Sequence, residues 1–172
     1  MLIYAAVIIV VAAVLYLSFR ALSGGEPVAA EDYRAVLTRI AGFVDDRAAQ
    51  IDAVMTHDTQ SKEQPREQRH LADDPLEVAA AARKALSGYQ QRLSSLETQA
   101  GGDERETLET ARSLLSAAIE DHGWVCRMLE SGSWRDNPGV QRATEALSAH
   151  GSECRRSAMA LLAESERVES GR

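Results

Sequence analysis

The chain has 172 residues, two cysteines, few aromatic residues and more acidic than basic side chains, so it is long enough for one ordinary domain and an appendage. A formal net charge of -7 would repel phosphate backbones, which argues against nucleic acid as a partner. The glycine, proline and cysteine counts exclude collagen-like, low-complexity and disulfide-dense proteins. A helical protein with one apolar segment remains.

The apolar segment lies at the start of the chain. Residues 1–17 carry no charge, and Arg20 is the one charged residue within 1–22. A helix that crosses a bilayer core of about 30 Å needs roughly 20 apolar residues, so residues 1–22 are predicted to be a single-pass transmembrane anchor in contact with the lipid bilayer. The alternative is a cleaved signal peptide ending near residues 21–23. The segment lacks a basic start and is longer than the usual apolar core of such peptides, which favours the anchor.

The basic residues around the anchor predict its orientation. None precedes it, whereas Arg20 lies near its C-terminal end and Arg34 and Arg39 follow it. Positive charge stays on the cytoplasmic side, so the N-terminus is expected outside and the remaining domain in the cytoplasm, at an inner or plasma membrane. Cysteines in that reducing compartment would be free or metal-bound rather than joined in a disulfide.

The rest of the chain is divided by composition and periodicity. Four segments place apolar residues three and four positions apart, as helices of a bundle or coiled coil do. We therefore expect an all-α fold, in which the N-terminal transmembrane helix is followed by an antiparallel four-helix bundle of long, coiled-coil-like helices. The predicted parts are a hinge at 23–27, a bundle domain at 28–168 with a charged linker at 57–74, and a polar tail at 169–172.

Local signals predict where three of the helices begin. Pro75 and Pro138 are expected at first helical positions, the latter after Asn137 as N-cap, and Asp103 is expected to cap the third helix. Gly151 would lie inside the fourth helix, where glycine weakens the helix and favours a kink. The apolar stripe predicted for this helix consists of Val140, Ala143, Leu147, His150, Cys154, Leu161 and Val168.

A repeated pentapeptide is the unusual local feature of the sequence. His122 precedes Cys126 by four residues, and His150 precedes Cys154 in the same way. Residues four apart share one face of a helix, so the two pairs could supply the two histidines and two cysteines of a tetrahedral zinc site. We therefore take these four side chains as candidate metal ligands and zinc as the possible cofactor.

Helix geometry opposes a site built from all four residues in one chain. If the third and fourth helices form a hairpin, His122 and His150 can approach, but Cys126 and Cys154 are separated by roughly 16 Å along the axis at 1.5 Å per residue. Joining them requires a break at Gly151 or a second subunit. The alternative is that both histidines lie in the core and both thiols are small buried fillers.

One further pair is a candidate partner contact. Trp134 lies in the turn before the fourth helix, next to Arg135. A tryptophan in a turn either covers the end of a bundle or forms a hot spot for a binding partner.

The sequence contains no P-loop, dinucleotide fingerprint, nucleophile elbow, HExxH or CxxC motif. An alanine-rich interior also suits close helices better than a substrate pocket. The prediction is a non-catalytic, membrane-anchored adaptor, scaffold or accessory subunit that binds a protein partner or forms a homo-oligomer. One alternative is a metal- or redox-responsive bundle that uses the His-Gly-x-x-Cys repeat. A second is an envelope-spanning coiled coil of the spanin type, with the opposite topology and with disulfides.

Overall fold

A computed structural model describes residues 27–61, 75–132, 134 and 136–170 of the chain. Four packed helices make up nearly all of this part, which confirms the predicted all-α bundle. They are α2 (Ala30–Ser61), α3 (Pro75–Ser95), α4 (Gly102–Glu130) and α5 (Pro138–Ser170). The predicted anchor at 1–22 lies outside the described residues, as does most of the predicted hinge. Among the described residues, no helix is both long enough and apolar enough to cross a membrane.

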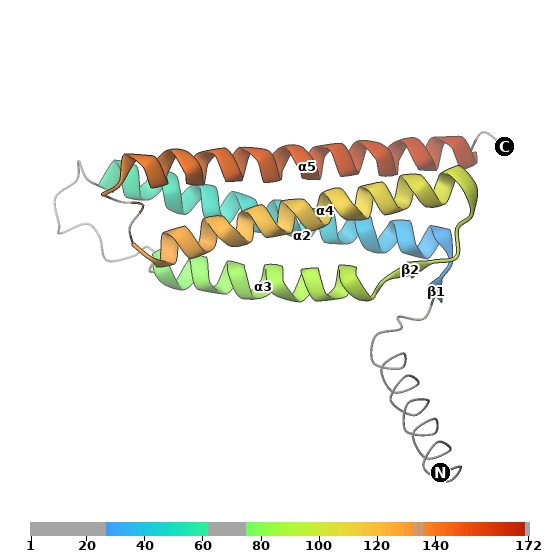
Figure 1. Cartoon of the computed structure of the whole chain (residues 1–172), viewed down its shortest axis with the longest axis horizontal. Coiled ribbons are helices and arrows are strands. Elements are labelled where there is room, and N and C mark those ends of the chain that lie inside the picture. The colour runs from blue at the N-terminus through green and yellow to red at the C-terminus, as the bar shows by residue number, and fades with distance from the viewer. Residues whose placement is uncertain (1–26, 62–74, 133, 135, 171–172) are drawn as a thin grey trace, which may run out of the picture.

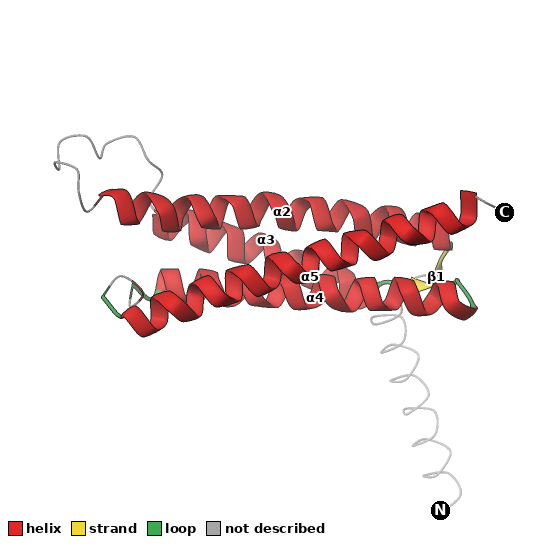
Figure 2. Ribbon diagram, turned by 90° about the horizontal axis from the view of Figure 1, so that it is seen from above, coloured by secondary structure: helices red, strands yellow, loops and turns green. Residues whose placement is uncertain are grey.

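The helices run back and forth along one long axis, so that each is antiparallel to the next (Figure 1). Helix α4 contacts all three of the others and packs most extensively against α5. Seen from above, α5 crosses α4 obliquely (Figure 2). The interface between α4 and α5 is therefore the main helix contact of the fold, and it carries both His-Gly-x-x-Cys sequences.

A short parallel sheet was not predicted from the sequence. Strand β1 (Pro27–Val28) pairs with β2 (Glu97–Thr98), with Pro27 opposite Glu97. The pairing joins the start of α2 to the connection between α3 and α4. Two-residue strands are shorter than any alternation of apolar and polar residues that could reveal them.

The apolar stripe predicted for α4 is buried along its whole length. It consists of Leu108, Ala111, Leu115, Ala118, His122, Val125 and Leu129. Helices α2 and α3 bury apolar residues three and four positions apart in the same core, among them Leu37, Ile40 and Val44 on α2 and Ala79, Ala82 and Leu86 on α3. The regular spacing of three and four residues was sufficient to orient these helices because leucine, isoleucine and alanine mark one face clearly.

The buried face of α5 differs from the predicted one. It is formed mainly by small residues, namely Thr144, Ser148, Gly151, Cys154, Ala158, Leu162 and Ser165. The predicted members Ala143 and His150 are exposed instead. A helix that approaches its neighbour closely needs small side chains at the contact, so the larger apolar residues of α5 are displaced toward the edge of the interface.

Gly151 provides that close approach and does not kink the helix, which continues unbroken through it. A Cβ atom on Gly151 would lie 3.0 Å from Nε2 of His122 and 3.2 Å from Cβ of Asp121. Ordinary contacts between such atoms are about 3.5–4.0 Å. The absence of a side chain at residue 151 therefore allows the His122 imidazole to pack on the α5 backbone.

The predicted helix starts are confirmed at two sites and changed at one. Helix α3 begins at Pro75, and Asn137 Oδ1 accepts the N–H of Gly139 at 2.9 Å at the start of α5. The Asp103 cap is wrong: α4 is preceded by Gly101, and Asp103 lies in its first turn. Gly102 has φ of +57°, a left-handed conformation that favours glycine, so the chain turns before Asp103 is reached.

Helix α2 also continues through Ser61, so the predicted linker at 57–74 begins as helix. Its first residues include neither proline nor glycine, and the first proline of the segment is Pro65. The predicted start of the linker at residue 57 is too early, because the polar residues that follow still belong to the helix.

Buried polar contacts tie α2 to α4 and α5. The guanidinium of Arg34, on α2, donates to Oε1 of Glu104 at 2.9 Å and to Oγ of Ser165 at 3.0 Å. Further along, the hydroxyl of Ser148 donates to Oδ1 of Asp52 at 2.9 Å. These contacts satisfy polar groups that would otherwise be costly inside a bundle.

Candidate metal centre

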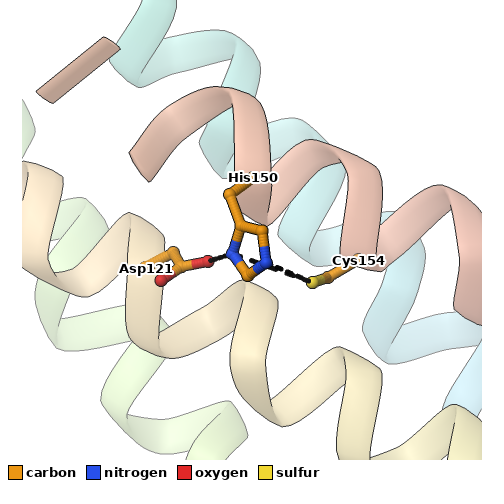
Figure 3. Close-up of side chains that lie close together, drawn as sticks. All are labelled: Asp121, His150 and Cys154. Carbon is orange, nitrogen blue, oxygen red and sulfur yellow. Dashed lines mark hydrogen bonds and ion pairs between the residues drawn. The ribbon is translucent and has the colours of Figure 1, made fainter. Parts of the chain in front are cut away.

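Three potential metal ligands meet where α4 and α5 pack against each other. Asp121 comes from α4, and His150 and Cys154 come from successive turns of α5 (Figure 3). One carboxylate oxygen, one ring nitrogen and the sulfur all lie within 4.8 Å of one another. This cluster could hold a metal ion.

The imidazole of His150 lies between the other two groups. Its Nδ1 is 2.6 Å from Oδ2 of Asp121, and its Nε2 is 3.7 Å from Sγ of Cys154. An ionised carboxylate can only accept a hydrogen bond, so Nδ1 carries the proton and its N–H donates a hydrogen bond to Oδ2 of Asp121. The lone pair of the neutral ring is then on Nε2, the nitrogen closer to the thiol.

The cluster is closed toward the bundle and open toward solvent. Cys154 is 8% exposed, the side chain of Asp121 is 16% exposed, and that of His150 is 65% exposed. Burial raises the pKa of the Cys154 thiol, and the negative charges of Asp121 and Glu153 raise it further. The free thiol therefore keeps its proton at neutral pH, and a bound metal ion would have to displace it.

The spacing of the α5 pair fits a tetrahedral ion. Zn²⁺ binds imidazole nitrogen at about 2.0–2.1 Å and thiolate sulfur at about 2.3 Å, which places the two ligand atoms about 3.6 Å apart. The 3.7 Å between Nε2 of His150 and Sγ of Cys154 matches this separation. Because Sγ is also only 3.9 Å from Nδ1, the imidazole must turn its Nε2 lone pair toward the ion, which the side chain can do without a change in the helix backbone.

The other predicted pair, His122 and Cys126, does not join the cluster. His122 is fully buried against Gly151, and neither ring nitrogen has a hydrogen-bond partner within the described part of the chain. Burial lowers the pKa of its imidazole. Burial raises the pKa of Cys126 to about 12, with a contribution from the charge of Glu130, which pairs with Arg83 of α3 at 2.7 Å. The environment of Cys126 is therefore the α3 side of α4, whereas Cys154 lies beside Asp121.

Asp121 was not among the predicted ligands, because the repeated His-Gly-x-x-Cys sequence points to histidine and cysteine alone. The register of the hairpin formed by α4 and α5 could have indicated this residue. When His122 is level with residue 147, Asp121 is level with residue 148, within one helical turn of His150. An acid at that level can face the exposed edge of α5.

The candidate partner contact changes in a similar way. Trp134 is 8% exposed and belongs to the core cluster, so it covers the end of the bundle, while Arg135 lies outside the described residues. The exposed tryptophan is Trp124, at 46%, and the guanidinium of Arg127 lies 4.6 Å from its ring centroid. Its position three residues after Asp121 places it near the cluster on the same helix.

Comparison of the chain with models of protein families, with curated proteins and with solved structures gives no match. The function must therefore be argued from the geometry of the cluster and the surface around it.

Proposed function

We propose that the protein is a metal-responsive helical module that binds Zn²⁺ between α4 and α5 and acts through protein contacts, without catalysis. The observation that carries this proposal is the convergence of Asp121, His150 and Cys154, with one ligand atom from each within 4.8 Å. Three residues of these types from two helices are the components from which zinc sites are built.

The types of ligand favour zinc over other common ions. Ca²⁺ and Mg²⁺ prefer oxygen ligands, and the cluster offers one carboxylate beside a nitrogen and a sulfur. Thiolate and imidazole together suit Zn²⁺, a d¹⁰ ion without redox chemistry and with a tetrahedral preference. The charge of Asp121 and Glu153 near the thiol also attracts a cation.

Zinc would act on the main interface of the bundle. An ion that binds the folded chain and not the unfolded one stabilises it by about 4 kcal/mol when free ion is roughly 1,000-fold above the Kd. Because Asp121 of α4 is bonded to His150 of α5, an ion held by His150 also stabilises the contact between these two helices, which is the most extensive in the fold. A change in zinc concentration would thus change how firmly this surface is presented to a partner.

The surroundings of the cluster favour a structural or regulatory ion. Enzymes enclose most of a small substrate in a pocket, whereas the His150 ring is 65% exposed on the outside of the bundle. Trp124, three residues after Asp121 on α4, is a large exposed aromatic with a cation over its face, a combination that is frequent at binding hot spots. A protein partner or a second copy of the chain is therefore the proposed ligand of this surface.

Residues 1–22 are proposed to hold the module at an inner or plasma membrane, with the bundle in the cytoplasm, as an adaptor, scaffold or accessory subunit would be. Their length and apolarity and the arginines that follow them support this arrangement. A spanin-type protein would have the opposite topology. A membrane-impermeant thiol reagent that labels Cys154 in inverted vesicles and not in intact cells would support the cytoplasmic topology.

The repeat itself supplies a matched pair of variants for testing zinc binding. Cys154→Ala and Cys126→Ala each remove a buried thiol that follows a histidine by four residues, but Cys154 alone belongs to the cluster. The full chain would be purified in detergent without chelator, and its zinc content measured by mass spectrometry after saturation and removal of free ion.

We expect wild type and Cys126→Ala to retain zinc and Cys154→Ala to lose it. Zinc should also raise the melting temperature of the first two proteins and leave that of the third unchanged. Wild-type protein that retains no zinc after saturation, with both thiols open to alkylation in the unfolded chain, would overturn the proposal. Equal zinc loss in both variants would show that the cluster is not the site.

A further inference from the structure

His150 can bind a metal ion through either ring nitrogen, and the structure distinguishes between them. Sγ of Cys154 lies at similar distances from the two, 3.9 Å from Nδ1 and 3.7 Å from Nε2, but Nδ1 alone is engaged with Oδ2 of Asp121, at 2.6 Å. An imidazole that donates one N–H to a carboxylate presents the opposite nitrogen to a metal, with its tautomer and orientation fixed by the carboxylate. The ligand atoms of α5 are therefore Nε2 of His150 and Sγ of Cys154.

Asp121 then acts on the histidine and does not bind the ion. Two atoms that both ligate a tetrahedral Zn²⁺ through nitrogen and oxygen lie about 3.3 Å apart. The 2.6 Å between Oδ2 of Asp121 and Nδ1 of His150 is too short for that and fits a charge-assisted hydrogen bond, and an ion on Nε2 lies on the opposite side of the ring from this carboxylate. Binding the carboxylate to the metal would require this bond to break.

This assignment leaves the coordination of one chain half complete. Each chain supplies one nitrogen and one sulfur from a single helix face, whereas a closed tetrahedral zinc site takes four protein ligands. The open half faces outward, because the His150 side chain is 65% exposed. Among the described residues, Asp121, His150 and Cys154 form the only group of three or more potential ligands.

We propose that a second copy of this chain completes the site, so that His150 and Cys154 of both copies hold one zinc ion as a two-histidine, two-cysteine centre. The inference rests on the proposed zinc binding and adds the partner, which is the chain itself. Asp121 of each copy is a positioning residue that holds the ring of its own His150.

Two His–Cys pairs can be arranged around one zinc ion with twofold symmetry. A twofold axis through the ion exchanges the two His–Cys pairs, and these pairs occupy opposite edges of the tetrahedron, which are perpendicular to each other. Each edge follows an α5 helix, so the two α5 helices cross at a steep angle. Two thiolates also neutralise the ion, which allows two acidic chains to meet there.

Exposed surface next to the cluster is available for the second copy. Trp124 lies one helical turn after Asp121 on α4 and is 46% exposed. Arg127 covers part of its ring and brings a positive charge to the surface of a chain with net charge -7. A copy placed over His150 would cover an aromatic ring of the type found at the centre of interfaces.

The test uses the full chain in detergent, titrated with Zn²⁺ after treatment with chelator, and measures both metal content and association state by sedimentation. We expect saturation at one zinc for two chains, with dimers that form on addition of zinc and dissociate in chelator. Cobalt in place of zinc should give a tetrahedral spectrum with a thiolate charge-transfer intensity of two sulfurs per ion. Cys126→Ala should behave as wild type, and Cys154→Ala should stay monomeric.

Asp121→Asn separates the positioning role from ligation. If Asp121 holds His150, the variant keeps one zinc for two chains and binds it about 10–100-fold more weakly. Saturation at one zinc per chain, whether the chain is monomeric or not, would overturn the two-copy site and leave the proposed zinc binding intact. Failure to bind zinc at all would remove both proposals, and the two failures are thereby distinguished.

Discussion

Replacing Gly151 by alanine tests the close approach of α4 and α5. In an unstrained helix interior, alanine is more stable than glycine by about 1 kcal/mol. Here the new Cβ would lie 3.0 Å from Nε2 of His122 and 3.2 Å from Cβ of Asp121. The His122 ring is fully buried, and the Cβ atoms of residues 121 and 151 can move only together with their own backbones. Helices α4 and α5 must therefore move apart. Overpacking of this kind costs about 1–3 kcal/mol, which gives a net loss of about 1 kcal/mol.

The assay is urea unfolding of the full chain in chelator, followed by far-ultraviolet circular dichroism. Gly88→Ala on α3 is the matched control, because a Cβ there meets nothing within 4 Å among the described residues. We expect the midpoint to rise for Gly88→Ala and to fall by about 0.5 M for Gly151→Ala, given a slope of about 2 kcal/mol per M. If Gly151→Ala stabilises the chain as much as the control does, the reasoning about the α4–α5 contact is refuted.

Three further predictions concern buried groups. Because burial lowers the pKa of His122, its imidazole stays neutral in the folded chain while the unfolded chain gains a proton below about pH 6.5, so stability falls with acidification. His122→Leu should make urea midpoints less sensitive to pH between about 6.5 and 5 than those of wild type; an unchanged slope would contradict this. Cys126, fully buried with a pKa raised to about 12, should react with iodoacetamide only on unfolding, and more slowly than Cys154 in metal-free protein; equal rates would contradict the structure. Arg34→Ala should cost about 1.5–3 kcal/mol because its guanidinium and its hydrogen bond to Ser165 are buried, whereas Arg83→Ala, at an exposed pair, should cost less in a calorimetric comparison; similar losses would contradict the assignment of buried and exposed pairs.

The sequence predicted the fold class and the α4 core because those residues carry the physical signal themselves. Leu108, Leu115 and Val125 mark one face of α4 by size and spacing. The N-cap at Asn137 followed equally from local chemistry. For such positions, the preference of the residue and its place in the fold agree.

The buried face of α5 could not be predicted in the same way. Its contact residues Thr144, Ser148 and Gly151 are small or polar, and they are buried because neighbouring helices lie close to them, α4 beside Thr144 and Gly151 and α2 beside Ser148. The predicted stripe included Leu147 because leucine is large and apolar, and the stripe therefore did not coincide with the buried face of α5. Burial at these positions depends on the distance between two helices, which a single-helix pattern does not contain.

The candidate site was predicted in part for a related reason. His150 and Cys154 were found because a spacing of four residues places them on one helix face. Asp121 comes from another helix, and its contact with His150 depends on the register and rotation of α4 against α5. The repeat suggested that Cys126 was equivalent to Cys154, but equal spacing does not give two helices the same neighbours.

X-ray absorption at the zinc edge of zinc-loaded full chain tests the central claim most directly. We expect a first shell with sulfur at about 2.3 Å and imidazole nitrogen at about 2.0–2.1 Å, and loss of the sulfur contribution in Cys154→Ala. A first shell of light atoms alone in wild type, or a sulfur shell that persists in Cys154→Ala, would contradict zinc binding by His150 and Cys154.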